Sequence, residues 1–257
     1  MEAPLYPQQP DPASVPSPSC WVTPRHLAGD DHLLADRVGD TLAAASWRMW
    51  PTSHRSLLYV SPNGLCTAEW VRAACPFELG GLPVAWQVSA RSHPDSAVPE
   101  WNAYFTAGLP HEVLVDFLFA LGSRAEPTAC FDRPETVLGA ACAQGWIRDI
   151  DRPRTTVLDP RLVAGISLED VPVLVQDSDP RSGLLGWQAW AEPVLGDPYL
   201  WCASFSASVP HDLVAVFASS LASPHPVRRH MLPTRSGRWL TVQRTEGDRR
   251  RRARRVD

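Results

Sequence analysis

Residues 101–123 read WNAYFTAGLPHEVLVDFLFALGS and residues 201–223 read WCASFSASVPHDLVAVFASSLAS, so the second stretch repeats the first at an offset of one hundred residues. Nine positions are identical without a gap, including a tryptophan, two phenylalanines and a Pro-His pair. Chance does not produce such a match, so the chain contains an internal duplication. A duplication of this length predicts architecture, and neither copy contains a recognisable catalytic motif.

Each copy has the pattern of a strand, a short connection and a helix. Trp101, Ala103 and Phe105 alternate with more polar residues, which is the period of a strand with one face in a core. Beyond Pro110 the apolar residues recur at helical spacing, and Glu112 places negative charge near the helix start. The sequence therefore predicts that a strand and a helix pack together in each copy.

The two duplicated histidines, His111 and His211, come directly after the duplicated prolines. A histidine at a helix start could be a base or a ligand, but such a site needs partner groups that the sequence does not identify. We interpret both histidines as parts of a repeated structural unit. Three tryptophan pairs, interpreted as core, also match between the copies: Trp47/Trp146, Trp86/Trp187 and Trp101/Trp201.

The expected fold class is α+β, with two pseudo-symmetric repeats that each contain a helix, a four-stranded antiparallel sheet and a second helix. In the first repeat the helix is expected over about 30–46, and the Asn63-Gly64 turn favours a hairpin. Connections this short require antiparallel pairing. The first-repeat strands are expected at 57–60, 65–72, 84–91 and 101–106. The predicted divisions are a disordered proline-rich arm (1–20), two repeats (21–124 and 125–225) and a C-terminal extension (226–257) with an arginine-rich tail.

The charge is unevenly distributed and excludes several classes of chemistry. All 24 basic residues are arginine, so no lysine is available for a phosphate-binding loop or a Schiff base. Residues 1–243 hold 17 arginines against 25 acidic residues, and an acidic body repels phosphate backbones. Residues 244–257 hold seven arginines against three acidic residues. Contact with a polyanion is therefore expected only through the tail, at Arg249, Arg250, Arg251, Arg252, Arg254 and Arg255.

The sequence indicates no metal, cofactor or membrane segment. None of the six cysteines forms a C-x-x-C pair, so we expect reduced thiols and a cytoplasmic protein. His26, Asp30 and His32 are better explained as a capped helix start than as metal ligands. The aspartate pairs 149/151 and 177/179 lie in loop stretches, where aspartate commonly makes turns. No apolar run is long enough to span a bilayer.

Several motifs resemble one known family. These are the TPRHLAG stretch at 23–29, the Ser-Pro-Asn-Gly turn at 61–64 and the W-x-A-x-F…P-x-[ED] block at 101–112 and 201–212. Together they resemble the SPDY domain, an actinobacterial domain of unknown function (domain 317) that often occurs in tandem. The turn departs from the family's Ser-Pro-Asp at Asn63, which argues against a fixed catalytic role. The resemblance implies tandem domains and no functional residue.

We therefore expect a non-enzymatic binding or scaffolding protein that contacts another protein. The candidate contact residues alternate with the proposed core on two strands: Gln87, Ser89, Arg91, Asn102 and Tyr104. One alternative is a nucleic-acid-associated accessory protein that uses the arginine-rich tail. A further alternative is an enzyme assembled from scattered Asp, His and Arg residues without a recognisable motif.

Overall fold

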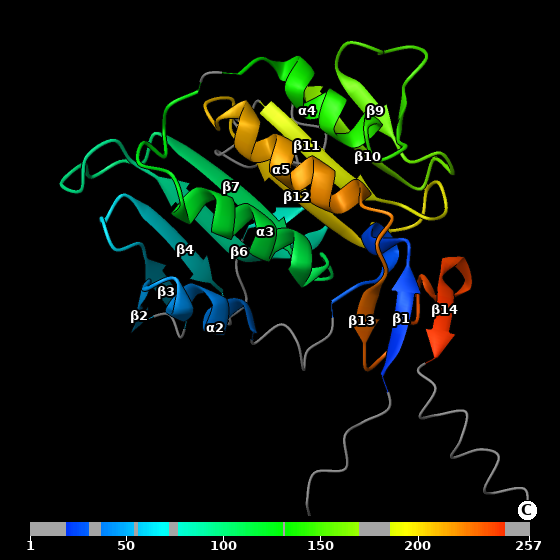
Figure 1. Ribbon diagram of the computed structural model, residues 1–257, viewed down its shortest axis with the longest axis horizontal. Coiled ribbons are helices and arrows are strands. Elements are labelled where there is room, and N and C mark those ends of the chain that lie inside the picture. Colours follow the sequence, from blue (N-terminus) through cyan, green and yellow to red (C-terminus); the bar gives the residue numbers. More distant parts are fainter. Residues whose placement is uncertain are drawn as a thin grey trace, which may run out of the picture.

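The computed structural model describes residues 19–30, 37–53, 56–71, 77–130, 132–169 and 186–244. Its main feature is one antiparallel sheet to which both repeats contribute (Figure 1). The strand order is β2-β3-β4-β6-β7-β12-β11-β10-β9-β8. In the first half the strands are β2 (Arg48–Pro51), β3 (Leu57–Val60), β4 (Cys66–Trp70), β6 (Leu82–Ala90) and β7 (Trp101–Thr106). In the second half they are β8 (Ile147–Arg148), β9 (Thr156–Leu158), β10 (Ala164–Glu169), β11 (Gly186–Ala191) and β12 (Trp201–Phe205).

The duplicated strands β7 and β12 join the two halves. They pair antiparallel, with Tyr104 opposite Ser204 and Phe105 opposite Ala203. Each half therefore presents the same strand to the other, and the strand order reverses across the junction. The α+β class and the antiparallel pairing follow the sequence analysis.

The strand count per repeat was wrong, because each half contributes five strands to the joined sheet and not four. The additional strands, β2 and β8, begin directly after the paired residues Trp47 and Trp146 and contain only four and two residues. Elements this short show no readable alternation. A further short strand, β5 (Glu78–Leu79), pairs with the start of β6.

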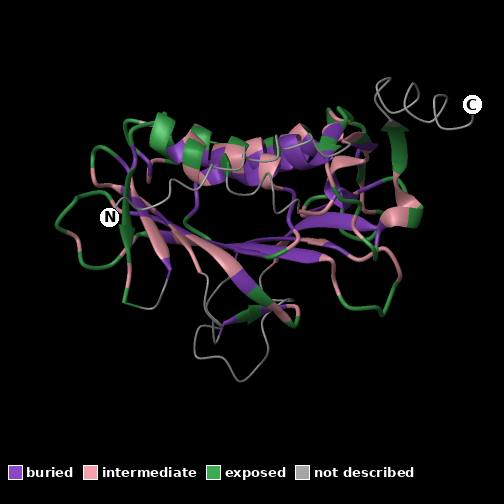
Figure 2. Cartoon of the chain, turned by 90° about the horizontal axis from the view of Figure 1, so that it is seen from below, coloured by how far each residue is buried: buried purple, intermediate pink, exposed green. Residues whose placement is uncertain are grey.

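Four helices of the described chain cover one face of the sheet: α2 (Arg37–Ala44), α3 (His111–Gly122), α4 (Pro134–Cys142) and α5 (His211–Ala222). Figure 2 shows them on one side, with their buried residues turned toward the strands. Of the helix expected over about 30–46, the structure describes only 37–44 as helix, and residues 31–36 lie outside the described part.

The core lies between this sheet face and the helices, and it contains the paired tryptophans. Trp101 and Trp201 are both fully buried, as the duplication predicts. The Trp101 indole donates a hydrogen bond to the carbonyl of Pro127 (3.1 Å), and the Trp201 indole donates one to the carbonyl of His26 (2.8 Å). Phenylalanines from the two central strands and the two duplicated helices meet in this core: Phe105, Phe117, Phe205 and Phe217.

A second, three-stranded sheet joins the two ends of the described chain. Strand β1 (Cys20–Thr23) lies between β13 (Val227–Arg229) and β14 (Thr241–Arg244), antiparallel to both (Figure 1). The segment 227–244, part of the expected extension, thus pairs with residues 20–23, where the expected arm meets the expected first repeat. Residues 1–18 and 245–257, which hold most of the predicted disordered arm (1–20) and the arginines at 249–255, lie outside the described residues. Cys20 was predicted to belong to the disordered arm, but it is part of β1. Within the described chain, no helix has the length and apolar character that crossing a bilayer requires.

Candidate binding site

The sheet face opposite the helices carries four of the five residues predicted to contact a partner. Gln87 pairs with Tyr104 and Ser89 pairs with Asn102 in the β6–β7 ladder. Two of the four are buried: Ser89 shares a hydrogen bond with the Thr67 hydroxyl (2.7 Å) and Tyr104 packs against a phenylalanine. That phenylalanine, Phe77, precedes β5, which covers this part of the sheet.

Arg91 lies just beyond the end of β6, and its guanidinium donates to the carbonyl of Ser96 (3.0 Å). Only Gln87, Arg91 and Asn102 therefore remain partly exposed among the five predicted contacts. Alternation placed the four strand side chains on one face of the sheet, but it could not reveal that Phe77 covers Tyr104. The structure does not gather the five into one site.

The residues weighed as metal ligands or carboxylate pairs make other contacts where the structure describes them. His26 is buried with its Nε2 atom 3.4 Å from an Asp159 carboxylate oxygen and its ring edge against Trp146. His32 and the 177/179 pair lie outside the described residues. The Asp149 carboxylate accepts a hydrogen bond from the backbone N–H of Asp151 (3.0 Å), which is the predicted turn interaction. Among the residues that the structure describes, no cluster of three or more His, Cys, Asp or Glu could hold a metal ion.

The duplicated histidines mark a different candidate site. In the second copy this site is closed, because a tryptophan contacts the histidine directly. His211 is the first residue of α5, and its Nδ1 atom accepts a hydrogen bond from the Trp187 indole N–H (3.1 Å). The two rings are nearly perpendicular, and Trp187 is 1% exposed. Burial lowers the pKa of His211, although the charges of Asp132 and Asp212 oppose that shift. The neutral imidazole of His211 therefore accepts a hydrogen bond from the indole N–H, and the side chain of Trp187 fills this position in the core.

The first copy arranges the same pair differently. Trp86, the counterpart of Trp187, is only partly buried and stacks on Trp70, with ring centroids 6.2 Å apart and planes at 13°. Trp70 is opposite Trp86 in the β4–β6 ladder, whereas Leu168 is opposite Trp187 in the β10–β11 ladder. The indole of Trp86 thus has an aromatic stacking partner that Trp187 lacks.

A cavity of about 510 Å³ lies beside His111 in this first copy. Its walls come from the ends of β4 and β7, from the middle of β6, from the start of α3 and from α2. Among the described residues that line the cavity, most are apolar or aromatic, and the titratable side chains are Asp30 and His111. The lining residues are Asp30, Val38, Trp70, Val71, Ala85, Trp86, Phe105, Thr106, Ala107, Gly108, Leu109, His111 and Leu114.

A second cavity, of about 450 Å³, shares Asp30, Ala107 and Gly108 with the first and reaches Trp201 and Arg235 across the junction. Gly108 has φ +90°, and a Cβ atom there would lie 2.6 Å from the carbonyl oxygen of Leu200. Only glycine allows the chain to pass this closely between the two cavities.

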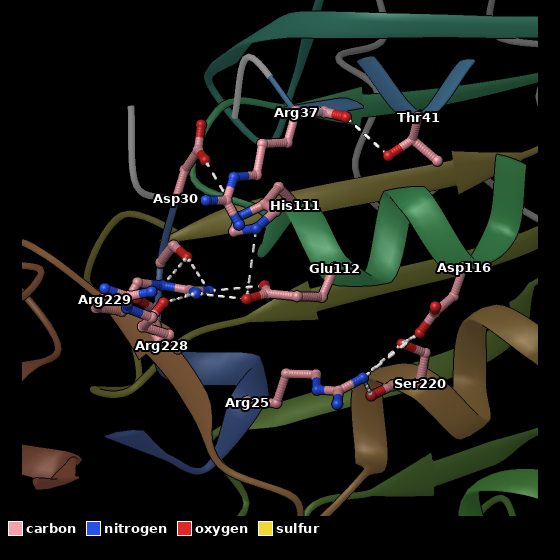
Figure 3. Close-up of polar contacts among 12 residues, drawn as sticks. Arg25, Asp30, Arg37, Thr41, His111, Glu112, Asp116, Ser220, Arg228 and Arg229 are labelled. Carbon is pink, nitrogen blue, oxygen red and sulfur yellow. Dashed lines mark hydrogen bonds and ion pairs between the residues drawn. The ribbon is translucent and has the colours of Figure 1, made fainter. Parts of the chain in front are cut away.

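A network of charges holds the α3 start beside the first cavity (Figure 3). The His111 Nδ1 atom is 4.0 Å from an Asp30 carboxylate oxygen, and its Nε2 atom is 3.5 Å from Glu112. The Arg37 side chain extends toward Asp30 and His111 from the other side. Glu112 in turn binds the two terminal nitrogens of Arg229, at 2.5 and 2.9 Å.

Arg229 anchors β13 to the start of α3. Its side chain is completely buried and also donates to the carbonyls of Ala28, Gly29 and Arg228. Burial disfavours the ionised form of Glu112, but the hydrogen bonds and charge of Arg229 outweigh it and hold the pKa of Glu112 below its usual range. The carboxylate is therefore ionised and fixed in place at neutral pH.

Sequence analysis recognised the duplicated histidines and tryptophans but not the site that they form. One sequence difference could have indicated the site: the residue opposite the duplicated tryptophan is Trp70 in the first copy and Leu168 in the second. Asp30 and Arg229 carried no such signal, because their positions depend on how distant segments pack.

Comparison with known families covers most of the residues that line the first cavity. The sequence model of the SPDY family, a domain of unknown function (DUF317), matches residues 60–128 and 173–227. We call these two matched stretches the first and second SPDY segments. No curated protein and no solved structure matches the chain. The first SPDY segment contains Trp86 and His111, and the second contains Trp187 and His211, so the open and closed arrangements occur at equivalent positions of the same domain.

Proposed function

We propose that this protein binds another protein, without catalysing a reaction, through the cavity beside His111 in the first SPDY segment. The observation that carries the proposal is the difference between the two copies. In the second segment the tryptophan and the histidine contact each other. In the first segment the equivalent pair is parted and lines a cavity.

The lining supports recognition of an inserted side chain. Ligand sites are usually cavities of roughly 300–1,000 Å³ with mainly apolar walls and a few polar groups that set orientation. Here Trp70, Trp86 and Phe105 supply aromatic surface, while Asp30 and His111 supply the polar groups. Protein interfaces commonly depend on one aromatic anchor that fills such a recess.

Photo-crosslinking in the native host tests the proposal. Ala107 is exposed and lines both cavities, so replacing it with p-benzoylphenylalanine positions the crosslinker at the site. Gln87, on the opposite sheet face, is the control position. We expect a discrete protein adduct from position 107 that disappears when Val71→Trp fills the cavity and persists with Val98→Trp, a change in an exposed loop.

The competing outcomes are distinct. An adduct formed only from position 87 would move the contact to the opposite face of the sheet and refute the cavity proposal. An adduct from position 107 that Val71→Trp does not affect would show that the partner passes the cavity without entering it, which also contradicts the proposal.

A further inference from the structure

The three-stranded sheet at the chain ends lies in a basic part of an otherwise acidic molecule. Residues 223–244 hold five arginines and no acidic residue, whereas residues 1–222 hold 13 arginines against 25 acidic residues. Strands β13 and β14 both belong to this basic stretch. Figure 1 shows their sheet at one side of the molecule, beside the larger sheet.

Three of these arginines carry charge that no described carboxylate offsets. Arg228, Arg235 and Arg238 are exposed, and none of them forms an ion pair with an acidic residue in the described part of the chain. Arg235 donates to the carbonyl of Tyr199 (3.1 Å), which positions the guanidinium without neutralising it. Their charge is therefore available to an anion from outside.

The outer face of this sheet places an aromatic ring between two polar side chains. Trp21 of β1 lies directly opposite Arg228 of β13 and Gln243 of β14. Residues opposite each other in antiparallel strands share a face, with Cβ atoms about 4.5–5.5 Å apart. Trp21 is 42% exposed and both neighbours are exposed, whereas Val22 and Val227 are buried on the other face. One face thus packs on the protein, and the other presents an indole beside a guanidinium and an amide.

This combination matches the chemistry of single-stranded nucleic acid. Proteins bind single strands by stacking bases on aromatic side chains while positive groups contact the phosphates. An acidic peptide would satisfy the arginines but would offer no base to the exposed indole. In a duplex, the faces of the bases are already stacked on each other.

We infer that the outer face of the β13–β1–β14 sheet binds single-stranded nucleic acid, with a base stacked on Trp21 and phosphates contacted by Arg228 and the neighbouring arginines. Sequence analysis limited polyanion contact to the tail, and this face lies directly before the tail, because β14 ends at Arg244. The inference goes beyond the proposed function and does not depend on the cavity.

Fluorescence anisotropy with a labelled oligothymidylate and the full chain tests the inference. The strand should exceed the roughly 4–16 nucleotides that one single-strand site covers. We expect saturable binding that weakens as salt rises, by about 0.7 in log K per log unit of salt for each phosphate contact. A duplex of equal length and poly-glutamate should each compete at least about tenfold less well, because neither presents a free base. Absence of saturable binding at low salt, or equal competition by either polyanion, would overturn the inference.

Variants with matched controls locate the binding. Trp21→Ala should weaken it about tenfold, whereas Trp50→Ala on β2, where the ring is 53% exposed, should leave it unchanged. Trp21→Tyr keeps an aromatic face and should retain most of the affinity. Arg228→Gln should reduce the salt dependence by about one phosphate contact, and Arg48→Gln in the exposed strand β2 should not.

Three outcomes separate this inference from its competitors. Circular dichroism checks each fold, and unchanged affinity in well-folded Trp21→Ala would assign binding to the tail alone and refute the role of the face. Tighter binding to phosphatidylglycerol vesicles than to the oligonucleotide would make the face a membrane contact, which also contradicts the inference. Val71→Trp fills the cavity and should leave nucleic-acid binding intact, so failure of the proposed function and failure of this inference are distinguishable.

Discussion

Replacing Phe205 with alanine should destabilise both repeats together. Phe205 is fully buried, and its ring contacts Phe105 at 5.5 Å, Phe117 at 5.7 Å and Phe217 at 5.0 Å between centroids. Two of these partners come from the other repeat. Truncating a buried phenylalanine usually costs about 3–5 kcal/mol, and each edge-to-face pair adds roughly 0.5–1.5 kcal/mol beyond simple burial. We expect a loss near the upper end of the first range.

The expected loss is large beside the roughly 5–15 kcal/mol that stabilises a typical native protein. Urea unfolding should measure the decrease in free energy, and differential scanning calorimetry should show one transition at a lower temperature. For a chain of this size each kcal/mol corresponds to roughly 2–4 °C. The matched control is Phe119→Ala on α3, where the ring is 66% exposed and the expected change is within about 0.5 kcal/mol.

A specific result would refute this reasoning. If Phe205→Ala produced two calorimetric transitions with only one displaced, the repeats would be independently stable units and the phenylalanine cluster would not couple them. A loss below about 1 kcal/mol would show that neighbouring side chains fill the space left by the ring.

Two further predictions concern buried charge. Arg229→Met should lower the free energy of unfolding by about 3–5 kcal/mol, because it leaves the Glu112 carboxylate and three carbonyls without their donor. Urea titration should show that adding Glu112→Gln restores part of the lost free energy. If the double variant restored none of it, the Arg229–Glu112 pairing would be contradicted. Burial, with a smaller effect of Arg161, lowers the pKa of His26 to about 3. Below pH 6.5 the imidazole therefore binds a proton in the unfolded chain but not in the folded chain, so the free energy of unfolding decreases as the pH falls toward 3. His26→Gln should remove up to about 2 kcal/mol of the stability loss that the native chain shows between pH 7 and pH 4.5. The raised pKa of Asp159 has the opposite effect on stability, in the native chain and in the variant alike. Identical profiles of stability against pH for the two proteins would refute the role of His26.

The local elements and the duplication were readable from the sequence because they depend on neighbours along the chain. Alternation at 101–105 and helical spacing after Pro110 predicted β7 and α3, and the offset of one hundred residues predicted the same elements again as β12 and α5. Burial of the tryptophan pair at 101 and 201 followed from the same patterns, since side chains on the inner face of a strand enter the core.

Only the tertiary structure decided how those elements combine. The pairing of β7 with β12 joins the free edges of two strands through their backbone groups, and the sequence carries almost no signal for which edges pair. Long-range packing likewise determines that Arg229 is buried on Glu112 and that residues near Phe77 cover Tyr104. Neither contact leaves a periodic pattern.

The difference between the two SPDY segments shows the same division most clearly. The duplicated Trp-His pair was visible in the sequence, but its geometry depends on residues outside the pair. Stacking on Trp70 holds Trp86 away from the position that Trp187 takes beside His211, where the opposing residue is leucine. A repeat in sequence specifies the same backbone twice, whereas the surrounding packing decides whether the recess in each copy is filled or open.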